Sequence, residues 1–145
     1  MLELINKALF IAQNEDVSTC SDCVVLYSIS FMPNEKNKLL AQEYLRQNIN
    51  AKILDDTPCG KSLIALGLNG KVNEVGEEIN KVWRIASKRF IEQASGNITA
   101  FVEGADERST FYTTELKEIL ENDKILTINK IDKFEFYKKF VPYRY

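Results

Sequence analysis

Three side chains in the sequence have types that could bind or transform a substrate. Trp83 is the only tryptophan among the 145 residues, and Asp55 and Glu115 lie before and after it. A tryptophan ring can form a binding platform, although a lone tryptophan more often packs in a core. The two carboxylates could serve a cleft, and each could also be an ordinary acid at the start of a helix. Residue types alone therefore predict an α/β domain with an acidic, aromatic cleft.

The absence of histidine excludes several kinds of catalytic site. Ser-His-Asp and Cys-His nucleophiles, histidine-ligated metals and histidine acid–base catalysis all need a residue that occurs zero times. Carboxylates must therefore do the ionic work of any enzyme built from this chain. The reaction should also suit a site without a strong general acid. We expect no metal site and no cofactor.

Composition predicts a single soluble domain covering residues 1–145. Hydrophobic residues make up 45% and charged residues 28%, and the formal net charge is -2. This charge argues against nucleic acid as a partner. No apolar run approaches the roughly 20 residues of a membrane helix, so we expect no membrane partner. Glu3, Asn6 and Lys7 interrupt the apolar start of the chain, which argues against a signal peptide.

The three cysteines are too few for a disulfide framework. Cys20 and Cys23 have the spacing of a redox pair or of half a zinc site. A zinc site would need further ligands, and only Cys59 is available. We therefore expect Cys20 and Cys23 to be buried or incidental thiols in a reducing compartment.

The pattern of apolar residues predicts helices that alternate with short strands. Helices are expected at 2–13, 35–46, 59–66, 73–94 and 113–121, with a last helical or mixed segment at 130–140. Strands are expected near 24–28, 98–102 and 124–128. The expected fold is therefore α/β, with a helical part over about 1–95 that contains one strand, a small mainly parallel sheet flanked by helices over about 96–145, and the cleft between the two parts.

The segment around Asp55 has a structural and a functional interpretation. Asp55-Asp56-Thr57-Pro58 is a strong helix-start pattern, and the two carboxylates would favour the helix dipole. A rigid helix start could equally place a carboxylate at the mouth of a cleft. Gly60-Lys61-Ser62 ends like a phosphate-binding P-loop, but the position that needs the first glycine is Asp55. The P-loop interpretation therefore fails.

The order of residues from 82 to 115 resembles the signature region of the ADP-ribosyl cyclase / NAD glycohydrolase family. That family has a tryptophan, a serine-containing helix, a small-residue break, an apolar strand and a Ser-x-Phe segment four residues ahead of a catalytic glutamate. The matching positions here are Trp83, Ser87, Phe90, Ala94-Ser95-Gly96, Ile98 to Val102, Ser109-Thr110-Phe111 and Glu115. Ile53 to Thr57 with Gly60, and Leu26-Tyr27-Ser28, resemble two further blocks in the family's order.

The resemblance implies a reaction and a set of roles. It implies cleavage of the nicotinamide–ribose bond of NAD or NADP, giving nicotinamide and ADP-ribose with some cyclic ADP-ribose. Glu115, Trp83 and Asp55 would be the catalytic residues, and Tyr27, Ser28, Ser87, Thr110 and Phe111 would bind substrate. The chain departs from the family where it has Tyr27 for tryptophan, Asp55 for glutamate and Ile29 for arginine, and it lacks the many cysteines of the secreted animal enzymes.

The resemblance also extends to bacterial toxin domains. It implies the C-terminal toxin domain of a secreted or surface effector, of the kind used in contact-dependent growth inhibition. Such a domain acts in the cytoplasm of a target cell and is held in check by an immunity protein. Two alternatives remain: another nucleoside or nucleotide glycosyl-transfer enzyme, and a non-catalytic interaction or immunity domain with the same fold.

Overall fold

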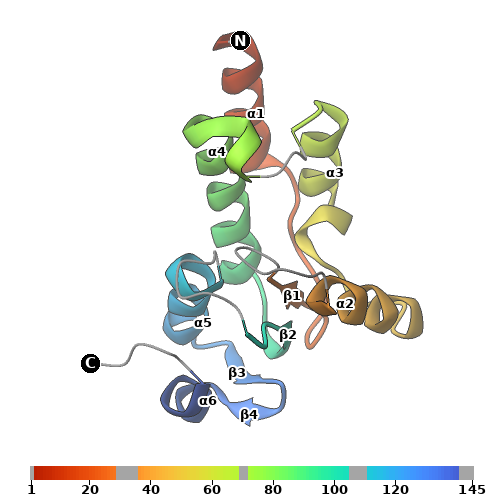
Figure 1. Ribbon diagram of the computed structural model, residues 1–145, viewed down its shortest axis with the longest axis vertical. Coiled ribbons are helices and arrows are strands. Elements are labelled where there is room, and N and C mark those ends of the chain that lie inside the picture. The colour runs from red at the N-terminus through yellow and green to blue at the C-terminus, as the bar shows by residue number, and fades with distance from the viewer. Residues whose placement is uncertain (1, 29–35, 69–71, 105–110, 141–145) are drawn as a thin grey trace.

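The computed structural model describes residues 2–28, 36–68, 72–104 and 111–140. The described part contains six α-helices and one four-stranded sheet, with the long helix α4 running through the molecule (Figure 1). The helices are α1 (Leu2–Asn14), α2 (Lys36–Gln47), α3 (Pro58–Ala65), α4 (Val72–Glu92), α5 (Leu116–Glu121) and α6 (Lys133–Phe140). The strands are β1 (Val25–Tyr27), β2 (Gly96–Phe101), β3 (Ile125–Ile128) and β4 (Ile131–Asp132). A 3₁₀ turn, η1 (Leu54–Asp56), precedes α3, and a π-helical turn, η2 (Phe111–Glu115), precedes α5.

The sheet is mainly parallel, as the alternation of helices and strands predicts. Its strand order is β1-β2-β3-β4, with parallel pairs β1–β2 and β2–β3 and an antiparallel pair β3–β4. Asn129 and Lys130 join β3 to β4 with φ angles of 52° and 65°. Two such residues make the tight turn that suits a twisted hairpin. The Asn129 amide also bonds the N–H and the carbonyl of Ala100, so this side chain continues the pairing of β2 beyond β3.

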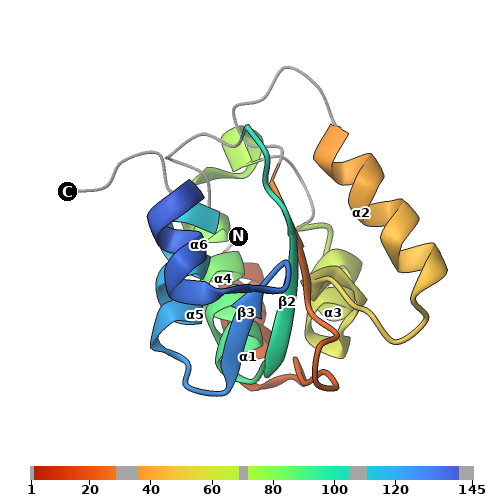
Figure 2. The same ribbon diagram turned by 90° about the horizontal axis from the view of Figure 1, so that it is seen from below.

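Helices cover the two faces of the sheet unequally. Alternate residues of β2 point to opposite faces, and Ile98 and Ala100 are buried against the core. On the outer face, Tyr44 of α2 packs on Phe101 with ring centroids 5.9 Å apart. Figure 2 shows α2 on one side of β1 and β2, and α5 and α6 on the other. Helix α2 therefore packs on the outer face of β1 and β2, while their inner face belongs to the main core.

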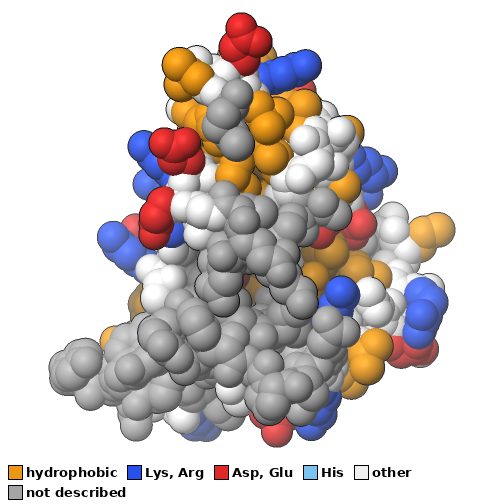
Figure 3. All heavy atoms as spheres, turned by 45° about the horizontal axis from the view of Figure 1, so that its top comes forward, with side chains coloured by type: hydrophobic (Ala, Val, Ile, Leu, Met, Phe, Trp, Pro, Cys, Tyr) orange, Lys and Arg blue, Asp and Glu red, His pale blue; other side chains and the backbone are white. Residues whose placement is uncertain are grey.

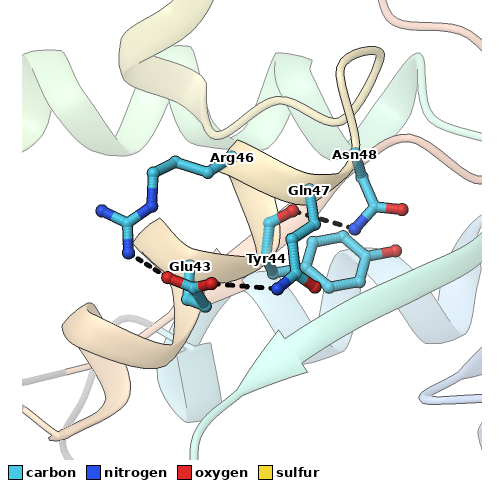
Figure 4. Close-up of polar contacts among 5 residues, drawn as sticks. All are labelled: Glu43, Tyr44, Arg46, Gln47 and Asn48. Carbon is cyan, nitrogen blue, oxygen red and sulfur yellow. Dashed lines mark hydrogen bonds and ion pairs between the residues drawn. The ribbon is translucent and has the colours of Figure 1, made fainter.

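The C-terminal end of α2 is held by its own side chains. Glu43 bonds both Arg46 and Gln47, and Asn48 donates to the Tyr44 carbonyl at 2.9 Å (Figure 4). These pairs are three and four residues apart, so they lie on neighbouring turns of one helix face. They fix the end of the helix on which the Tyr44 ring stands.

Helix α4 is interrupted once, at Gly76. This residue has φ 80° and ψ 171°, a conformation outside the helical region that glycine adopts without steric cost. The sequence predicts one continuous helix over 73–94, and this prediction is wrong at Gly76. Beyond it the helix is regular, and Val82, Ala86 and Phe90 are completely buried along one stripe.

One residue, Asn122, links the ends of three helices. Asn122 donates from its amide nitrogen to the carbonyls of Ile91, Glu92 and Ala94 at the end of α4. The backbone carbonyl of Asn122, at the end of α5, accepts from Lys133 Nζ at 2.8 Å. Lys133, the first residue of α6, is buried, and its ammonium also donates to an α5 carbonyl. The last carbonyls of a helix have no hydrogen-bond partner within the helix, and these side chains supply donors for them.

The cysteine prediction is wrong for two of the three residues. Cys20 and Cys23 form a disulfide, with their Cα atoms 5.4 Å apart. Cys59 is a free, completely buried thiol that donates to the Ile11 carbonyl at 3.4 Å, and burial raises its pKa. Among the described residues, no group of three or more cysteine, aspartate and glutamate side chains is placed to hold a metal ion.

Hydrophobic side chains gather near the end of the molecule formed by α1, α3 and the start of α4 (Figure 3). On α1, Leu2 and Phe10 are 73% and 65% exposed. Both side chains therefore lie on an exposed part of this helix. None of the helices in the described ranges is both long enough and apolar enough to cross a bilayer.

Candidate active site

The candidate site begins with a hydrogen bond between two residues that are far apart in sequence. Ser87 Oγ donates to Glu115 Oε2 at 2.7 Å. Ser87 lies on the regular part of α4 and is 5% exposed, while Glu115 ends the π-helical turn η2. Both η2 and α5 pack against α4, which brings the carboxylate to this face of the helix. Single π-helical turns are rare and occur frequently at functional sites.

The Glu115 carboxyl is held in a setting that favours its neutral form. Burial raises the pKa of Glu115 to about 7, although the hydrogen bond from Ser87 acts in the opposite direction. The residue keeps a small exposed surface, so the carboxyl group is enclosed but remains close to solvent. A carboxyl that titrates near neutral pH and lies at the surface of a packed core is typical of a catalytic group.

Trp83 lies one helical turn before Ser87 on α4. Its ring is half-buried against the core, and Nε1 donates to the Leu68 carbonyl at 2.6 Å. Residues i and i+4 share a helix face, so Trp83 and the Ser87–Glu115 pair lie next to one another along α4. The hydrogen bond to Leu68 fixes the orientation of the indole. The sequence does not reveal this role of Leu68, because a backbone carbonyl leaves no sequence pattern.

Asp55 lies in η1, and the local sequence explains how it is held. Thr57 Oγ1 donates to the Leu54 carbonyl at 2.7 Å and accepts from the Gly60 N–H at 3.1 Å, so Thr57 closes η1 and caps α3. A Cβ on Gly60 would lie 2.1 Å from the Leu54 oxygen and 2.7 Å from Asp55 Cα. The predicted helix start is therefore confirmed, and Gly60 is required for the backbone of Asp55 to pass so close to α3.

The Asp55 side chain is exposed, but nearby protein still affects its ionisation. Partial burial of the carboxyl group and the charge of Asp56 raise the pKa of Asp55, while Lys38 acts in the opposite direction. The η1 turn packs against α4, the helix that also carries Trp83 and Ser87. Asp55 and Glu115 are thus held on two different elements that contact the same helix.

Tyr27 and Ser28 lie at the carboxyl end of β1. Tyr27 is half-buried, and Ser28 is 6% exposed. Within the described residues, the buried Ser28 hydroxyl has no hydrogen-bond partner. An unpaired buried hydroxyl has a free-energy cost, and a bound ligand would remove it. In sheets of this kind ligands bind beyond the carboxyl ends of the strands.

Asn37 also belongs to this region, although no sequence motif indicates a role for it. It is 1% exposed, and its Nδ2 donates to the carbonyls of Ser28 and Glu103, each at 3.0 Å. These carbonyls follow β1 and β2, so Asn37 joins the ends of two neighbouring strands. A polar residue on the face of α2 that the apolar periodicity predicts to be buried is the sequence feature that could indicate such a role.

Of the last two predicted binding residues, Phe111 and Thr110, the structure describes only Phe111. The Phe111 side chain is buried in the core, edge-on to the rings of Tyr112 and Phe136. It anchors η2, and any contact with substrate falls to its backbone N–H. Thr110, with Ser109 before it, lies outside the described residues.

One groove of about 340 Å³ lies away from this group of residues. It runs between α5 and α6 and shares no residue with the candidate site; its lining consists of Tyr112, Leu116, Lys117, Leu120, Glu121 and Tyr137. Glu115 directly precedes Leu116, yet its carboxyl reaches Ser87 on α4 instead.

Replacing Ser87 with alanine is expected to raise the pKa of Glu115 further. The hydroxyl stabilises the charged carboxylate, so its removal should move the titration upward by about one pH unit. Carbon-13 NMR of the glutamate carboxyl measures this titration directly. Ser62→Ala is a matched control, because the Ser62 hydroxyl bonds Glu15 instead. An unchanged titration in Ser87→Ala would show that the hydrogen bond is absent in solution.

The fold is that of the ADP-ribosyl cyclases and CD38. Porcine CD38, complexed with a covalent intermediate, ribo-F-ribose-5'-phosphate, matches with a TM-score of 0.57 and 23% sequence identity, over 87% of this chain and 67% of that one. Aplysia cyclase, complexed with substrate NGD and product cGDPR, matches with a TM-score of 0.56 and 16% identity, over 87% of this chain and 62% of that one. At these identities the likeness concerns the fold.

Comparison of the amino-acid sequence gives no match. No protein-family model matches the chain, and no curated protein matches it. The chain spans about two thirds of the length of the structures it resembles, 67% for CD38 and 62% for the cyclase. The predicted α/β arrangement, with helices and a small mainly parallel sheet, is confirmed.

Proposed function

We propose that the protein is an NAD⁺ glycohydrolase, which cleaves the nicotinamide–ribose bond to give nicotinamide and ADP-ribose, with some cyclic ADP-ribose. The observation that carries this proposal is the Ser87–Glu115 hydrogen bond, which holds a carboxyl of raised pKa one helical turn from Trp83. The fold shared with CD38 and the cyclases supports it. NAD or NADP is the substrate, and no cofactor is required.

The chemistry suits a site without histidine. When the C–N bond breaks, its electron pair moves to the pyridinium nitrogen, so nicotinamide leaves as a neutral molecule and needs no proton. Positive charge develops at the ribose carbon, and the Glu115 carboxylate stabilises it or forms a bond to it. Water then adds to that carbon and releases a proton, giving ADP-ribose. Glu115 therefore acts in its charged form.

The remaining residues would bind and orient the dinucleotide. The nicotinamide is a cation before cleavage, and stacking on the Trp83 indole is worth about 0.5–2 kcal/mol. Tyr27 forms a second aromatic surface, and Asp55 accepts from the carboxamide. Ser28, Thr110 and the Phe111 backbone N–H bind the diphosphate. The unpaired, buried hydroxyl of Ser28 supports its part in this arrangement.

The raised pKa of Glu115 predicts how the reaction depends on pH. Because the charged carboxylate is the active form and its pKa is about 7, kcat/KM should rise with pH and level off above about 8. At pH 5, two pH units below this pKa, kcat/KM should be about 100-fold lower than its plateau. A profile that is flat from pH 5 to 9 would contradict the assigned role of Glu115.

The direct test is to incubate the protein with NAD and measure free nicotinamide, ADP-ribose and cyclic ADP-ribose by chromatography. Release of nicotinamide in step with ADP-ribose is the expected result. The alternatives give different results with the same assay. A non-catalytic interaction domain releases nothing, and a glycosyl-transfer enzyme of another specificity cleaves other nucleosides or nucleotides but leaves NAD intact.

The biological setting is part of the proposal. Uncontrolled NAD cleavage harms a cell, which supports the role of a bacterial toxin domain delivered by a secreted or surface effector. It would act in the cytoplasm of the target cell, with an immunity protein as its partner. Expression that is harmless without any inhibitor, despite activity against NAD in vitro, would contradict this setting and leave the enzymatic proposal intact.

A further inference from the structure

The segment Cys20–Cys23 is a second chemically reactive place in the molecule, and the proposed function does not use it. Its two cysteines are bonded to each other and differ in exposure, since Cys20 is exposed and Cys23 is 8% exposed. The third cysteine, Cys59, is completely buried. A thiolate in solution can therefore reach the disulfide at Cys20 only. Access of this kind distinguishes exchangeable disulfides from purely structural ones.

The disulfide closes a turn that is pressed against the start of β2. Asp22 lies in this turn with φ 66°, a conformation that residues other than glycine seldom adopt. Its N–H donates to the Ser95 carbonyl at 3.0 Å, and its Oδ1 accepts from the Asn97 N–H at 2.7 Å. Gly96 lies between them, and a Cβ there would meet Asp22 Oδ1 at 2.1 Å. Two hydrogen bonds and this close packing thus hold the turn against the segment where α4 ends and β2 begins.

We propose that the Cys20–Cys23 disulfide is a thiol-exchange site for an external dithiol, and that its reduction loosens the turn that holds the α4–β2 junction. One thiolate of the dithiol attacks Cys20 Sγ, the disulfide breaks, and Cys23 leaves as a thiolate that takes a proton from water. The second thiol of the reagent then displaces Cys20 and forms a disulfide within the reagent. The dithiol is oxidised by two electrons, and the protein disulfide is reduced by two.

The consequence for the fold follows from the geometry of Asp22. With the disulfide in place, the four-residue ring restricts the backbone of Asp22 in both the folded and the unfolded chain. After reduction, the unfolded chain gains freedom and Asp22 can leave its left-handed conformation. The junction then loses two hydrogen bonds and its cover over Gly96. We expect the thermal midpoint of unfolding to fall by about 3–6 °C.

The test uses dithiothreitol as the dithiol and iodoacetamide to label free thiols in the folded protein. Intact-mass spectrometry should find no label before reduction and two labels after it, with Cys59 labelled only in denaturant. The thermal midpoints of unfolding of the oxidised and reduced proteins then measure how much the disulfide stabilises the fold. Two labels before reduction, no label after it, or identical unfolding midpoints would each overturn the proposal.

Two variants separate exchange from a general loss of stability. Cys20→Ser/Cys23→Ser should unfold at the midpoint of the reduced protein and should not respond to dithiothreitol. In Asp22→Ala the side-chain bond to Asn97 is already lost, so reduction should lower the midpoint by less than in the wild type. An equal decrease in Asp22→Ala would overturn the part of the proposal that runs through Asp22.

Discussion

Replacing Glu115 with glutamine is expected to reduce kcat for NAD cleavage by about 1,000-fold or more. Glutamine keeps the size of the side chain and can still accept from Ser87. It carries no negative charge, however, so it cannot stabilise the positive ribosyl centre. KM should change much less, because the lost interaction is made mainly in the transition state. Chromatographic measurement of nicotinamide across substrate concentrations gives both constants.

The same substitution should make the protein more stable at alkaline pH. The pKa of Glu115 is raised from 4.5 to about 7 in the folded protein, so folding favours the protonated carboxyl. Its stabilising effect is complete below pH 4.5 and is lost as pH rises through 7. Glutamine does not titrate, so the advantage of Glu115→Gln over the wild type should be about 2–3 kcal/mol larger at pH 8 than at pH 4.

The control for both measurements is Glu121→Gln. Glu121 is an exposed residue on α5 with no part in the proposed reaction. It should leave both the rate and the pH dependence of stability as in the wild type. A Glu115→Gln protein that cleaves NAD at the wild-type rate would remove Glu115 from the mechanism. A loss of rate with lower stability at pH 8 would indicate misfolding instead.

Gly60→Ala is expected to give the largest loss of stability of any single methyl addition at a described glycine. The new Cβ would stand 2.1 Å from the Leu54 carbonyl oxygen, and that contact is with backbone, which cannot rotate away. Either η1 or α3 must move, at a cost of about 3 kcal/mol or more. Urea denaturation followed by circular dichroism measures the difference. Since η1 carries Asp55, binding of NAD should weaken as well.

Gly67→Ala separates this steric effect from ordinary backbone strain. Gly67 has φ 82° and nothing within 4 Å of an added Cβ. Alanine there should cost only the strain of the left-handed conformation, about 1 kcal/mol. If Gly60→Ala costs no more than Gly67→Ala, then η1 does not pack against α3 as closely as described.

The helix-forming patterns allowed much of the fold to be predicted. The apolar stripe of α4 indicated its buried face, and Thr57-Pro58 indicated the start of α3. Both signals are local, because they depend on residues within a few turns of each other. The break at Gly76 was missed because a glycine inside a helical pattern is usually tolerated. Strand β4 was missed because two residues after an Asn-Lys turn leave almost no pattern.

Contacts between distant segments were harder to predict. Ser87 and Glu115 were associated only through the resemblance to the cyclase family, since spacing alone identified a helix residue and a helix-start acid. The packing of η2 on α4 is what joins them. Asn37 was missed because its two partners are backbone carbonyls. The Cys20–Cys23 spacing fits thiols, metal ligands and a disulfide equally, and only the backbone turn at Asp22 separates these cases.

The position of Asn122 also bears on how the molecule opens. Its amide holds the end of α4, its carbonyl receives Lys133 from α6, and it ends α5 itself. Neither α4 nor α6 can fray from that end without breaking a bond to the end of α5. In amide hydrogen exchange, α4, α5 and α6 should therefore behave as one cooperative unit with a common opening free energy. The backbone amides next to Glu115, at the start of α5, should exchange with this same free energy.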